Sequence, residues 1–265
     1  MPGASPSATH SARHDDIVAV VLAAGAGRRL RPLSDVRPKA LCPVNNVALV
    51  DHALARAETV ANDIAVNVHH GRELMEQHLA GRAHLSVEEP DALGTAGALG
   101  LLRSWIDGRP VLVLNSDVWP RYHLSELVEG WDRARTRLLM VEGADGRGFG
   151  PLTYAGAALM PWSAVAALEP MPSGLYEVSW RSLAAAGQLD LVTTDRPFFD
   201  CGTPGEYLAA NLAASGGSSV IGAGAIVHGE VVRSVVWPGG IVRSGERLVD
   251  SIRVGADLTV TPNAP

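Results

Sequence analysis

The stretch that decides the fold is IVAVVLAAGAGRRLRPLSDVRPKALCPV, residues 17–44. Its first part, residues 17–23, is continuously apolar and rich in β-branched side chains, which is typical of a strand buried on both faces of a parallel sheet. The loop that follows contains Gly25 and Gly27, which let the backbone approach a ligand closely. Because ligands of open α/β sheets bind beyond the carboxyl ends of the strands, we expect this loop to line the functional site.

Apolar runs and amphipathic patterns alternate along the rest of the first 215 residues. The further strands predicted from these runs are 64–68, 84–87, 111–115, 137–141 and 189–194. The predicted helices are 50–61, 72–80, 95–105, 124–134, 161–186 with a break at 170–174, and 205–215. This alternation predicts an α/β domain with a doubly wound, Rossmann-like, mostly parallel sheet and helices on both faces.

The sequence changes in character after residue 215. Aliphatic residues recur from Ile221 to Val254 at a spacing of roughly six residues, with glycine or other small residues between them. The pattern predicts a short, left-handed β-helix of hexapeptide repeats, and a small β-hairpin cap is the alternative. We therefore divide the chain into a tail (1–16), an α/β domain (17–215) and a β-helix segment (216–265). The tail is rich in Pro, Ser and Ala, which predicts disorder and not a signal peptide.

The composition narrows the class of protein. With 265 residues, 47% of them hydrophobic and 19% charged, the chain is typical of a globular protein with a sizeable core. Its net charge of −6 argues against a nucleic-acid partner. No apolar run reaches the length of a membrane span. Two cysteines far apart, Cys42 and Cys201, are typical of reduced thiols, so we expect a cytoplasmic protein that is not bound to a membrane.

Lys39 is the single lysine among the 22 basic residues of the chain. A genome rich in GC codons replaces lysine by arginine wherever charge alone matters, so one surviving lysine can be a matter of chance. The other interpretation is that its position requires a compact point charge on a flexible stem, which the planar arginine fork does not supply. Composition alone does not separate the two.

The whole loop carries a stronger signal than its glycines. The pattern L-A-A-G-x-G-x-R-L-x-P-L-S-x-x-x-P-K-A-L-x-P-V closely resembles the N-terminal signature of the sugar-1-phosphate nucleotidyltransferases, also called NDP-sugar pyrophosphorylases. Four later segments resemble further motifs of that family: EEPDALGTAGAL (88–99), VLVLNSDV (111–118), TYAGAA (153–158) and FDCGTP (199–204). The resemblance extends to mannose-1-phosphate guanylyltransferases and to muramic acid-1-phosphate uridylyltransferase-like members, and the sequence leaves both open.

The resemblance implies transfer of a nucleotidyl group from an NTP to a sugar 1-phosphate, with Mg²⁺ as cofactor and pyrophosphate as the second product. Arg29 matches the arginine that clamps the β- and γ-phosphates. Lys39 matches the lysine that contacts the α-phosphate, and it completes with Arg29 and Asp117 the implied catalytic set. Asp117 and Asp200 match the two carboxylates that hold the metal.

The resemblance also implies residues for each substrate. The nucleotide-binding residues would be Leu22, Ala24, Gly25, Gly27, Glu88, Gly94 and Thr95. Glu88 or Glu89 would lie near the base, and a carboxylate there could accept two hydrogens from a guanine edge, a hint towards GTP. Tyr154, Gly156 and Glu177 would bind the sugar, although Glu177 can equally be a charge at a helix N-terminus.

The chain departs from the family pattern at two positions. It lacks the Glu-Lys-Pro element whose lysine binds the sugar phosphate, and Arg147 is the candidate substitute. Ser116 stands where the family has glycine. An alternative function therefore remains, that of a weak or inactive regulatory paralogue that binds nucleotide or nucleotide-sugar. We also expect a homo-oligomer that associates through the C-terminal segment, since short coils leave open edges.

Overall fold

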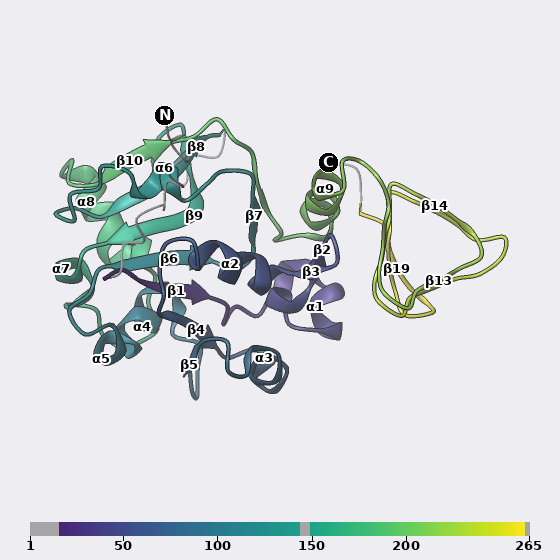
Figure 1. The fold of residues 1–265 in the computed structure, drawn as a ribbon, viewed down its shortest axis with the longest axis horizontal. Helices are drawn as coiled ribbons and strands as arrows, with labels where there is room; N and C mark the ends of the chain where they lie inside the picture. The colour runs from purple at the N-terminus through teal and green to yellow at the C-terminus, as the bar shows by residue number, and fades with distance from the viewer. Residues whose placement is uncertain (1–15, 144–148, 263–265) are drawn as a thin grey trace, which may run out of the picture.

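The computed structural model describes residues 16–143 and 149–262, so the predicted tail lies outside the described residues except for Asp16. A central seven-stranded sheet has the order β10-β8-β9-β6-β1-β4-β5 (Figure 1). Its strands are β1 (Val18–Leu22), β4 (Ile64–Val68), β5 (His84–Val87), β6 (Val111–Asn115), β8 (Arg137–Glu142), β9 (Leu152–Met160) and β10 (Asp190–Thr193).

The sheet is mostly parallel, as predicted. Strand β9 is the exception, because it lies antiparallel between β6 and β8. This strand was not predicted, since residues 153–158 were identified only as a segment that resembles a family motif. Its run of alanines lacks the β-branched residues that mark the other strands, so its strand character comes from pairing with its two neighbours.

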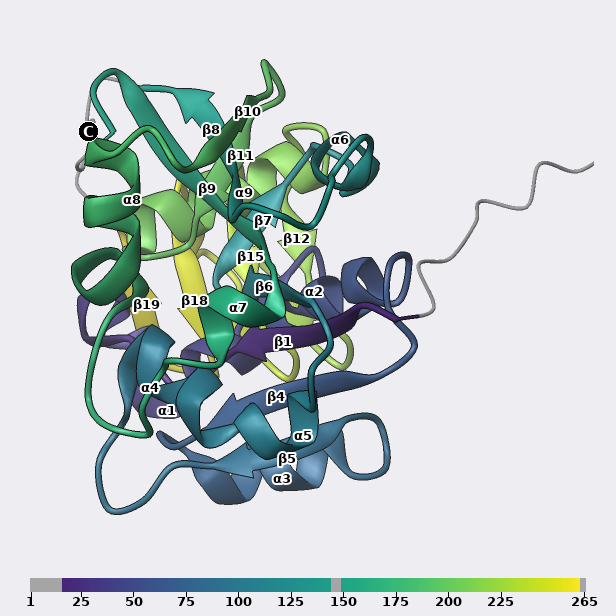
Figure 2. The same ribbon diagram turned by 90° about the vertical axis from the view of Figure 1, so that its left-hand side faces the viewer.

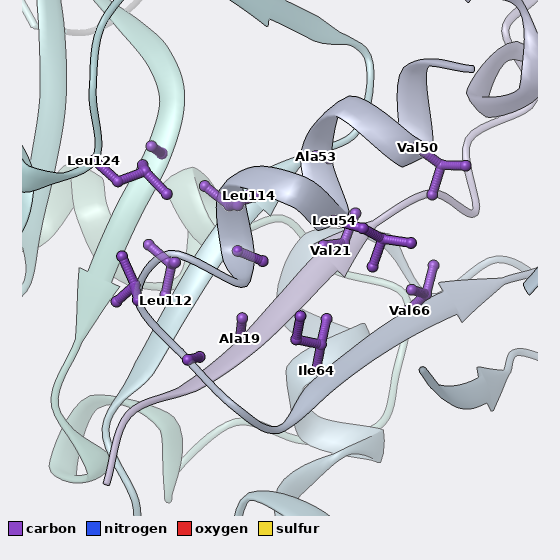
Figure 3. Close-up of a cluster of buried hydrophobic side chains, with 14 of the residues drawn as sticks. Ala19, Val21, Val50, Ala53, Leu54, Ile64, Val66, Leu112, Leu114 and Leu124 are labelled. Carbon is purple, nitrogen blue, oxygen red and sulfur yellow. The ribbon is translucent and has the colours of Figure 1, made fainter. Parts of the chain in front are cut away.

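Helices cover both faces of the sheet. They are α2 (Leu49–Ala57), α3 (Arg72–Leu79), α4 (Gly94–Leu101), α5 (Arg103–Ile106), α6 (Ser125–Val128), α7 (Trp162–Val165), the π-helix η3 (Tyr176–Trp180), α8 (Arg181–Ala185) and α9 (Pro204–Ala214). Ala19 and Val21 of β1 pack towards α2 (Figure 3), while Val18 and Val20 pack towards α4 and α5. This alternation follows from the two-residue period of a strand. Figure 2 views the molecule from the side of α5, α7 and α8.

Two predicted helices are shorter than expected. The segment 124–134 forms only the one-turn α6, because Glu129 is extended and Gly130 has a φ of 64°. The segment 161–186 is divided, near the predicted break, into α7 and the continuous pair of η3 and α8, with irregular backbone around Pro170–Gly174 between them. In both cases the apolar period continues beyond the turn that ends the helix.

After residue 215 the chain winds in successive turns, here called the C-terminal coils, and short strands of one coil pair with those of the next. They are β12 (Val220–Ile221), β13 (Ile226–Val227), β14 (Glu230–Val232), β15 (Val235–Val236), β16 (Ile241–Val242), β17 (Arg247–Val249), β18 (Ile252–Val254) and β19 (Leu258–Val260). Strands β12, β15 and β18 pair in parallel, as do β13 with β16 and β14 with β17. Only the last pair, β18 and β19, is antiparallel. Parallel pairing between successive coils does not fit the alternative of a β-hairpin cap.

One hydrophobic cluster joins the C-terminal coils to the α/β domain. Val220, Val235, Trp237 and Ile252 from the coils pack with residues of α9 and of the loop after β1 (Figure 1). The two predicted segments therefore share a core. Within residues 16–143 and 149–262, no helix has the length and apolar character that a membrane span requires.

Candidate active site

A pocket of about 220 Å³ lies beyond the carboxyl ends of β1, β4 and β6. Its lining comes from three predicted motifs and from the end of β4: Leu22, Ala23, Ala24, Gly25, Lys39, Ala40, Asn67, Ala92, Gly94, Thr95, Asn115, Ser116 and Asp117. The pocket lies where these strands pass into loops, which is the position predicted for a ligand. Ser116, which departs from the family pattern, donates its hydroxyl hydrogen to Leu22 O at 2.7 Å.

Lys39 is buried beside the pocket, with 8% of its surface exposed. It begins the 3₁₀ turn η2 (Lys39–Leu41). Gly27, with a φ of 61°, makes room for it, because a Cβ at Gly27 would lie 2.9 Å from the Lys39 Cβ. Pro38 is held in turn by Gly71, where a Cβ would overlap the proline ring. The glycines and the proline therefore fix the backbone that presents the lysine.

The ammonium of Lys39 lies between two carboxylates. Its Nζ donates to Asp117 Oδ2 at 2.6 Å and lies 3.8 Å from Asp200 Oδ1. Asp117 directly precedes strand β7 (Val118–Pro120), and Asp200 ends strand β11 (Phe198–Asp200), which pairs antiparallel with β7. Cys201 N also donates to Asp117 O at 2.9 Å. The structure thus brings together three residues that are far apart in the sequence.

Asp200 is the less satisfied of the two acids. Its Oδ1 is buried and has no hydrogen-bond partner among the described residues. Burial raises the pKa of the Asp200 carboxyl, the nearby Asp117 raises it further, and Lys39 partly offsets both. A divalent cation between the two carboxylates would give Oδ1 of Asp200 a partner, and hard carboxylate oxygens are what Mg²⁺ prefers. Among the described residues no group of three or more acid, His or Cys side chains converges on a metal position, so substrate and water would complete the coordination.

Arg29 is more exposed than Lys39. It belongs to the 3₁₀ turn η1 (Arg28–Leu30), and its Nη2 lies 3.6 Å from Asp200 Oδ2. A Cβ at Gly202 would lie 2.7 Å from the same Nη2, so the glycine lets the guanidinium pass over the chain after Asp200. Three of the predicted active-site residues, Arg29, Lys39 and Asp200, therefore meet at one edge of the pocket.

Glu88 is fully buried, with 0% of its surface exposed. Its Oε1 accepts a hydrogen bond from Asn67 Nδ2 at 2.7 Å, and its Oε2 accepts one from Leu93 N at 2.7 Å. Both oxygens are therefore used inside the protein, where they support the pocket wall. The contact of Glu88 with the base, and with it the hint towards guanine, stays a prediction.

Asn67 is the pocket residue that the sequence analysis missed. Its Oδ1 accepts a hydrogen bond from Ala23 N at 2.7 Å, so Glu88, Asn67 and the loop after β1 form one buried chain of hydrogen bonds. The signal was present, since Asn67 is the one polar residue in the apolar strand IAVNV. A polar residue at the carboxyl end of a buried strand is a candidate for support of the neighbouring loop.

The remaining predicted nucleotide-binding residues line the pocket or support it. Thr95 Oγ1 accepts a hydrogen bond from Leu175 N at 2.8 Å, so it ties α4 to the segment before η3. Gly94 has a φ of 70°, and a Cβ there would lie 2.6 Å from Ser173 O. Leu22, Ala24 and Gly25 lie in the lining, whereas Gly27 lies against Lys39.

The three predicted sugar-binding residues lie outside the pocket lining. Tyr154 packs edge-on against Trp180 with ring centroids 5.0 Å apart, and its buried hydroxyl has no hydrogen-bond partner among the described residues. Burial holds the pKa of that hydroxyl well above its usual range. Gly156, with a φ of 82°, lets β9 pass close to Val118. Glu177 is exposed in the first turn of η3, and its carboxylate lies against Gly174, which fits a charge at a helix start. Arg147 lies outside the described residues.

Comparison with known proteins gives this site its family. Residues 18–151 match the model of the family described as nucleotidyl transferase. The N-acetylmuramate alpha-1-phosphate uridylyltransferase of Caulobacter vibrioides is 30% identical over 230 residues, which cover 73% of this chain and 95% of the relative. The chain belongs to the nucleotidyl transferase family. The resemblance seen in the sequence motifs is thereby confirmed, and the chain is an enzyme of the transferase class.

This nucleotidyltransferase is also similar to mannose-1-phosphate guanylyltransferase 1 of Arabidopsis thaliana, with 26% identity over 72% of this chain and 62% of the plant enzyme. Among solved structures, a Bacillus anthracis protein named as a glucose-1-phosphate thymidylyltransferase matches with a TM-score of 0.63 and 19% identity. That match covers 75% of this chain and 95% of the other. At this identity the likeness shows the α/β fold.

The buried Glu88 leads to a first prediction. We expect Glu88→Gln to lower the free energy of unfolding by about 1–3 kcal/mol, because the amide presents a donor to either Asn67 Nδ2 or Leu93 N. The affinity should fall alike for every nucleotide, since the whole loop shifts. Thermal unfolding and nucleotide titration measure the two effects.

Glu89→Gln is the matched control, because the Glu89 carboxylate is 65% exposed and, among the described residues, pairs only with Arg72 on the surface. It should unfold like the wild type. An unchanged melting temperature in Glu88→Gln, together with an affinity lost for GTP alone, would show that Glu88 contacts the base after all.

Proposed function

We propose that the protein transfers a nucleotidyl group from an NTP to a sugar 1-phosphate and forms an NDP-sugar and pyrophosphate, with Mg²⁺ as cofactor. The observation that carries the proposal is the buried Lys39, which two carboxylates share at the edge of a pocket lined by a glycine-rich loop. The family to which the chain belongs supports the nucleotidyl transfer. The names of its relatives support a sugar 1-phosphate as acceptor.

The reaction brings two polyanions together, so catalysis consists mainly of positioning and charge neutralisation. An oxygen of the sugar 1-phosphate attacks the α-phosphorus in line with the bond to the leaving pyrophosphate. Lys39 lies at the pocket edge and would stabilise the negative charge that develops on the α-phosphate oxygens. Arg29, exposed at the entrance, would bind the β- and γ-phosphates through its planar fork.

Asp117 and Asp200 would hold Mg²⁺. The unpartnered Oδ1 of Asp200 supports this assignment, since it leaves a buried carboxylate oxygen for the ion. The raised pKa of the Asp200 carboxyl, caused by burial and by the neighbouring Asp117, also supports it, because a bound cation would stabilise the charged form. When bound, the ion would neutralise charge on the reacting phosphates. Lys39 leaves room for this role, because its hydrogen bond occupies only Asp117 Oδ2.

We propose UTP as the nucleotide and a muramic acid-type 1-phosphate as the sugar. The uridylyltransferase from Caulobacter vibrioides is matched over 95% of its length, which supports this choice. The two hydrogen bonds that Glu88 accepts inside the protein also argue against its use for a guanine edge. GTP with mannose 1-phosphate is the second candidate, favoured by the similarity to the plant guanylyltransferase. The keeping of Lys39, Asp117 and Asp200 together argues against an inactive paralogue.

The location and the sugar-phosphate contact stay proposals as well. We propose a cytoplasmic enzyme, supported by the two free, buried thiols of Cys42 and Cys201. We also propose that Arg147 replaces the family lysine at the sugar phosphate. The net charge of −6 supports substrates other than nucleic acid.

The function is tested by pyrophosphate release from UTP, GTP, ATP, CTP and dTTP, each with N-acetylmuramate, mannose and glucose 1-phosphates. We expect the highest rate with UTP and the muramate, and loss of turnover when EDTA removes Mg²⁺. Turnover with GTP and mannose 1-phosphate would keep the reaction and overturn the specificity. Nucleotide binding without release in any pair would overturn the reaction itself.

Lys39→Arg tests the role of the single lysine. The change keeps the charge but puts a planar fork into a site that is only 8% exposed, so kcat should fall about 10²–10³-fold. The melting temperature and the KM for the nucleotide should change far less. Arg31→Lys is the control in the same loop, because within the part of the chain that the structure describes Arg31 pairs only with Asp35 on the surface. Its exchange should leave kcat unchanged. Near wild-type turnover in Lys39→Arg would make the single lysine a matter of chance.

We propose further that the C-terminal coils wind in the left-handed sense and that the protein self-associates through them. Four large apolar side chains on the coils support self-association, since they are between 37% and 48% exposed: Ile221, Ile226, Val227 and Val249. Burial of these side chains against a second copy would lower the free energy of the dimer relative to two separate monomers.

Sedimentation should therefore give a species larger than the monomer, and Ile226→Asp should shift it to the monomer. Leu74→Asp is the control, because Leu74 is similarly exposed, at 47%, but lies on α3. A wild-type protein that sediments as a single monomeric species would contradict the proposal.

A further inference from the structure

Trp237 links the C-terminal coils to the α/β domain. It follows β15 and is 1% exposed. Its indole Nε1 donates a hydrogen bond to the hydroxyl of Tyr207 at 2.9 Å. On the other side, the guanidinium of Arg37 lies 4.6 Å from the centre of its ring. Trp237 thus contacts both α9 and the loop that leads into Lys39.

Two side chains of helix α9 contact the segment after Lys39. The hydroxyl of Tyr207 donates a hydrogen bond to Pro43 O. Asn211, one turn further along the same helix, donates to Pro43 O at 3.4 Å and accepts from Asn45 N at 2.9 Å. Residues 43–45 are therefore held by two fully buried side chains of α9.

The same helix is also tied to the acidic side of the site. It begins at Pro204, just after the residues that carry Asp200. Thr203 caps it through a capping box with Glu206, so its first turn is rigid. The backbone N–H of Cys201 donates a hydrogen bond to the backbone carbonyl of Asp117. Helix α9 is consequently fixed to Asp200 at one end and to the Lys39 segment along its side.

We propose that the C-terminal segment is part of the catalytic architecture and that Trp237 is a positioning residue for Lys39. Trp237 orients the Tyr207 hydroxyl, Tyr207 and Asn211 hold residues 43–45, and these hold Lys39 at its distance from Asp117 and Asp200. Val220, Val235 and Ile252 would suffice to attach the coils by apolar contacts alone. The directed hydrogen bonds add a defined geometry, because each buried donor has one specific acceptor. The consequence for turnover rests on the proposed function.

Cys42 reports on this segment without any need for turnover. Its side chain is fully buried between Lys39 and Pro43, and its Sγ lies 3.8 Å from Pro38 O. Burial raises the pKa of the Cys42 thiol to about 12, so it reacts only when the segment opens. Labelling by a maleimide, followed by mass spectrometry of the peptide that contains Cys42, measures that opening.

Trp237→Phe removes the indole N–H and keeps an apolar ring. Well below the melting temperature, we expect labelling of Cys42 to accelerate by about tenfold, which corresponds to the loss of one buried hydrogen bond. In turnover, kcat should fall by a similar factor with little change in the nucleotide KM. Tyr207→Phe should have the same effects, and the double variant should be no worse than Tyr207→Phe alone, because Trp237 acts through Tyr207.

Two controls separate positioning from a general loss of stability. Leu248→Ala creates a cavity in the other core cluster of the coils, with Val236 and Val242, and should lower the melting temperature without faster labelling or lower kcat. Trp131→Phe removes the same indole donor from a hydrogen bond of 2.8 Å to Arg135 O. Arg135 precedes β8, so this bond lies at the amino ends of the parallel strands, opposite the carboxyl ends that border the pocket. The variant should behave like the wild type.

The proposal is overturned if Trp237→Phe and Tyr207→Phe label and turn over like the wild type. It is also overturned if Cys42 is labelled as fast in Leu248→Ala as in Trp237→Phe and Tyr207→Phe when the three variants have lost the same melting temperature. A wild-type protein without turnover would instead contradict the proposed function, and the labelling rates would still decide whether Trp237 holds the segment of Lys39.

Discussion

The shared position of Lys39 between Asp117 and Asp200 is the constraint on which the rest of the site depends. A buried ammonium is tolerated only when carboxylates compensate its charge, and here Lys39 is shared by two acids, one of which also faces Arg29. Burial raises the pKa of the Asp200 carboxyl and Asp117 adds to this, although Lys39 and Arg29 lower it. The charges of the cluster are therefore balanced, while Oδ1 of Asp200 has no hydrogen-bond partner among the described residues.

The fold brings these three residues together by joining separate parts of the chain. Lys39 comes from the loop after β1, Asp117 follows β6, and Asp200 ends β11, which returns to pair with β7. Because β1 and β6 are neighbours in the sheet, their carboxyl ends open on the same edge. Helix α9 then starts directly behind Asp200 and packs against the segment after Lys39, so one helix supports both sides of the charge cluster.

The walls of the pocket depend on buried polar groups, of which Asn67 belongs to the lining and Glu88 lies outside it. Glu88 holds Asn67 and the backbone of Leu93, and Asn67 holds Ala23. Such a chain defines the pocket shape because every buried donor and acceptor in it needs its partner. The Trp237–Tyr207–Pro43 chain has the same character on the other side of Lys39, and both chains join residues that are far apart in the sequence.

By itself the sequence determined the sheet, the family and the set of charged residues. Burial on both faces of a parallel sheet demands continuous apolar runs, so β1, β4 and β6 were predicted from local composition alone. The motifs also identified Lys39, Asp117 and Asp200, since the chemistry of a polyanion pocket demands those residue types. Strand β9 and the early end of α6 were not predicted. Pairing with β6 and β8 makes β9 a strand, and the backbone of Gly130 ends α6, so both override the local pattern.

Only the tertiary structure decided which polar residues support the site from behind. Glu88 was expected at the base, but its oxygens are taken by Asn67 and Leu93, and Asn67 itself was not singled out. Tyr207 reaches Pro43 across 164 positions of the chain. The physical reason is that the partner of a buried polar group can come from any part of the chain that the fold brings within reach, so the local sequence does not reveal it. Burial of one face of a strand or helix, in contrast, requires apolar residues at a regular spacing, and that spacing can be recognised in the local sequence.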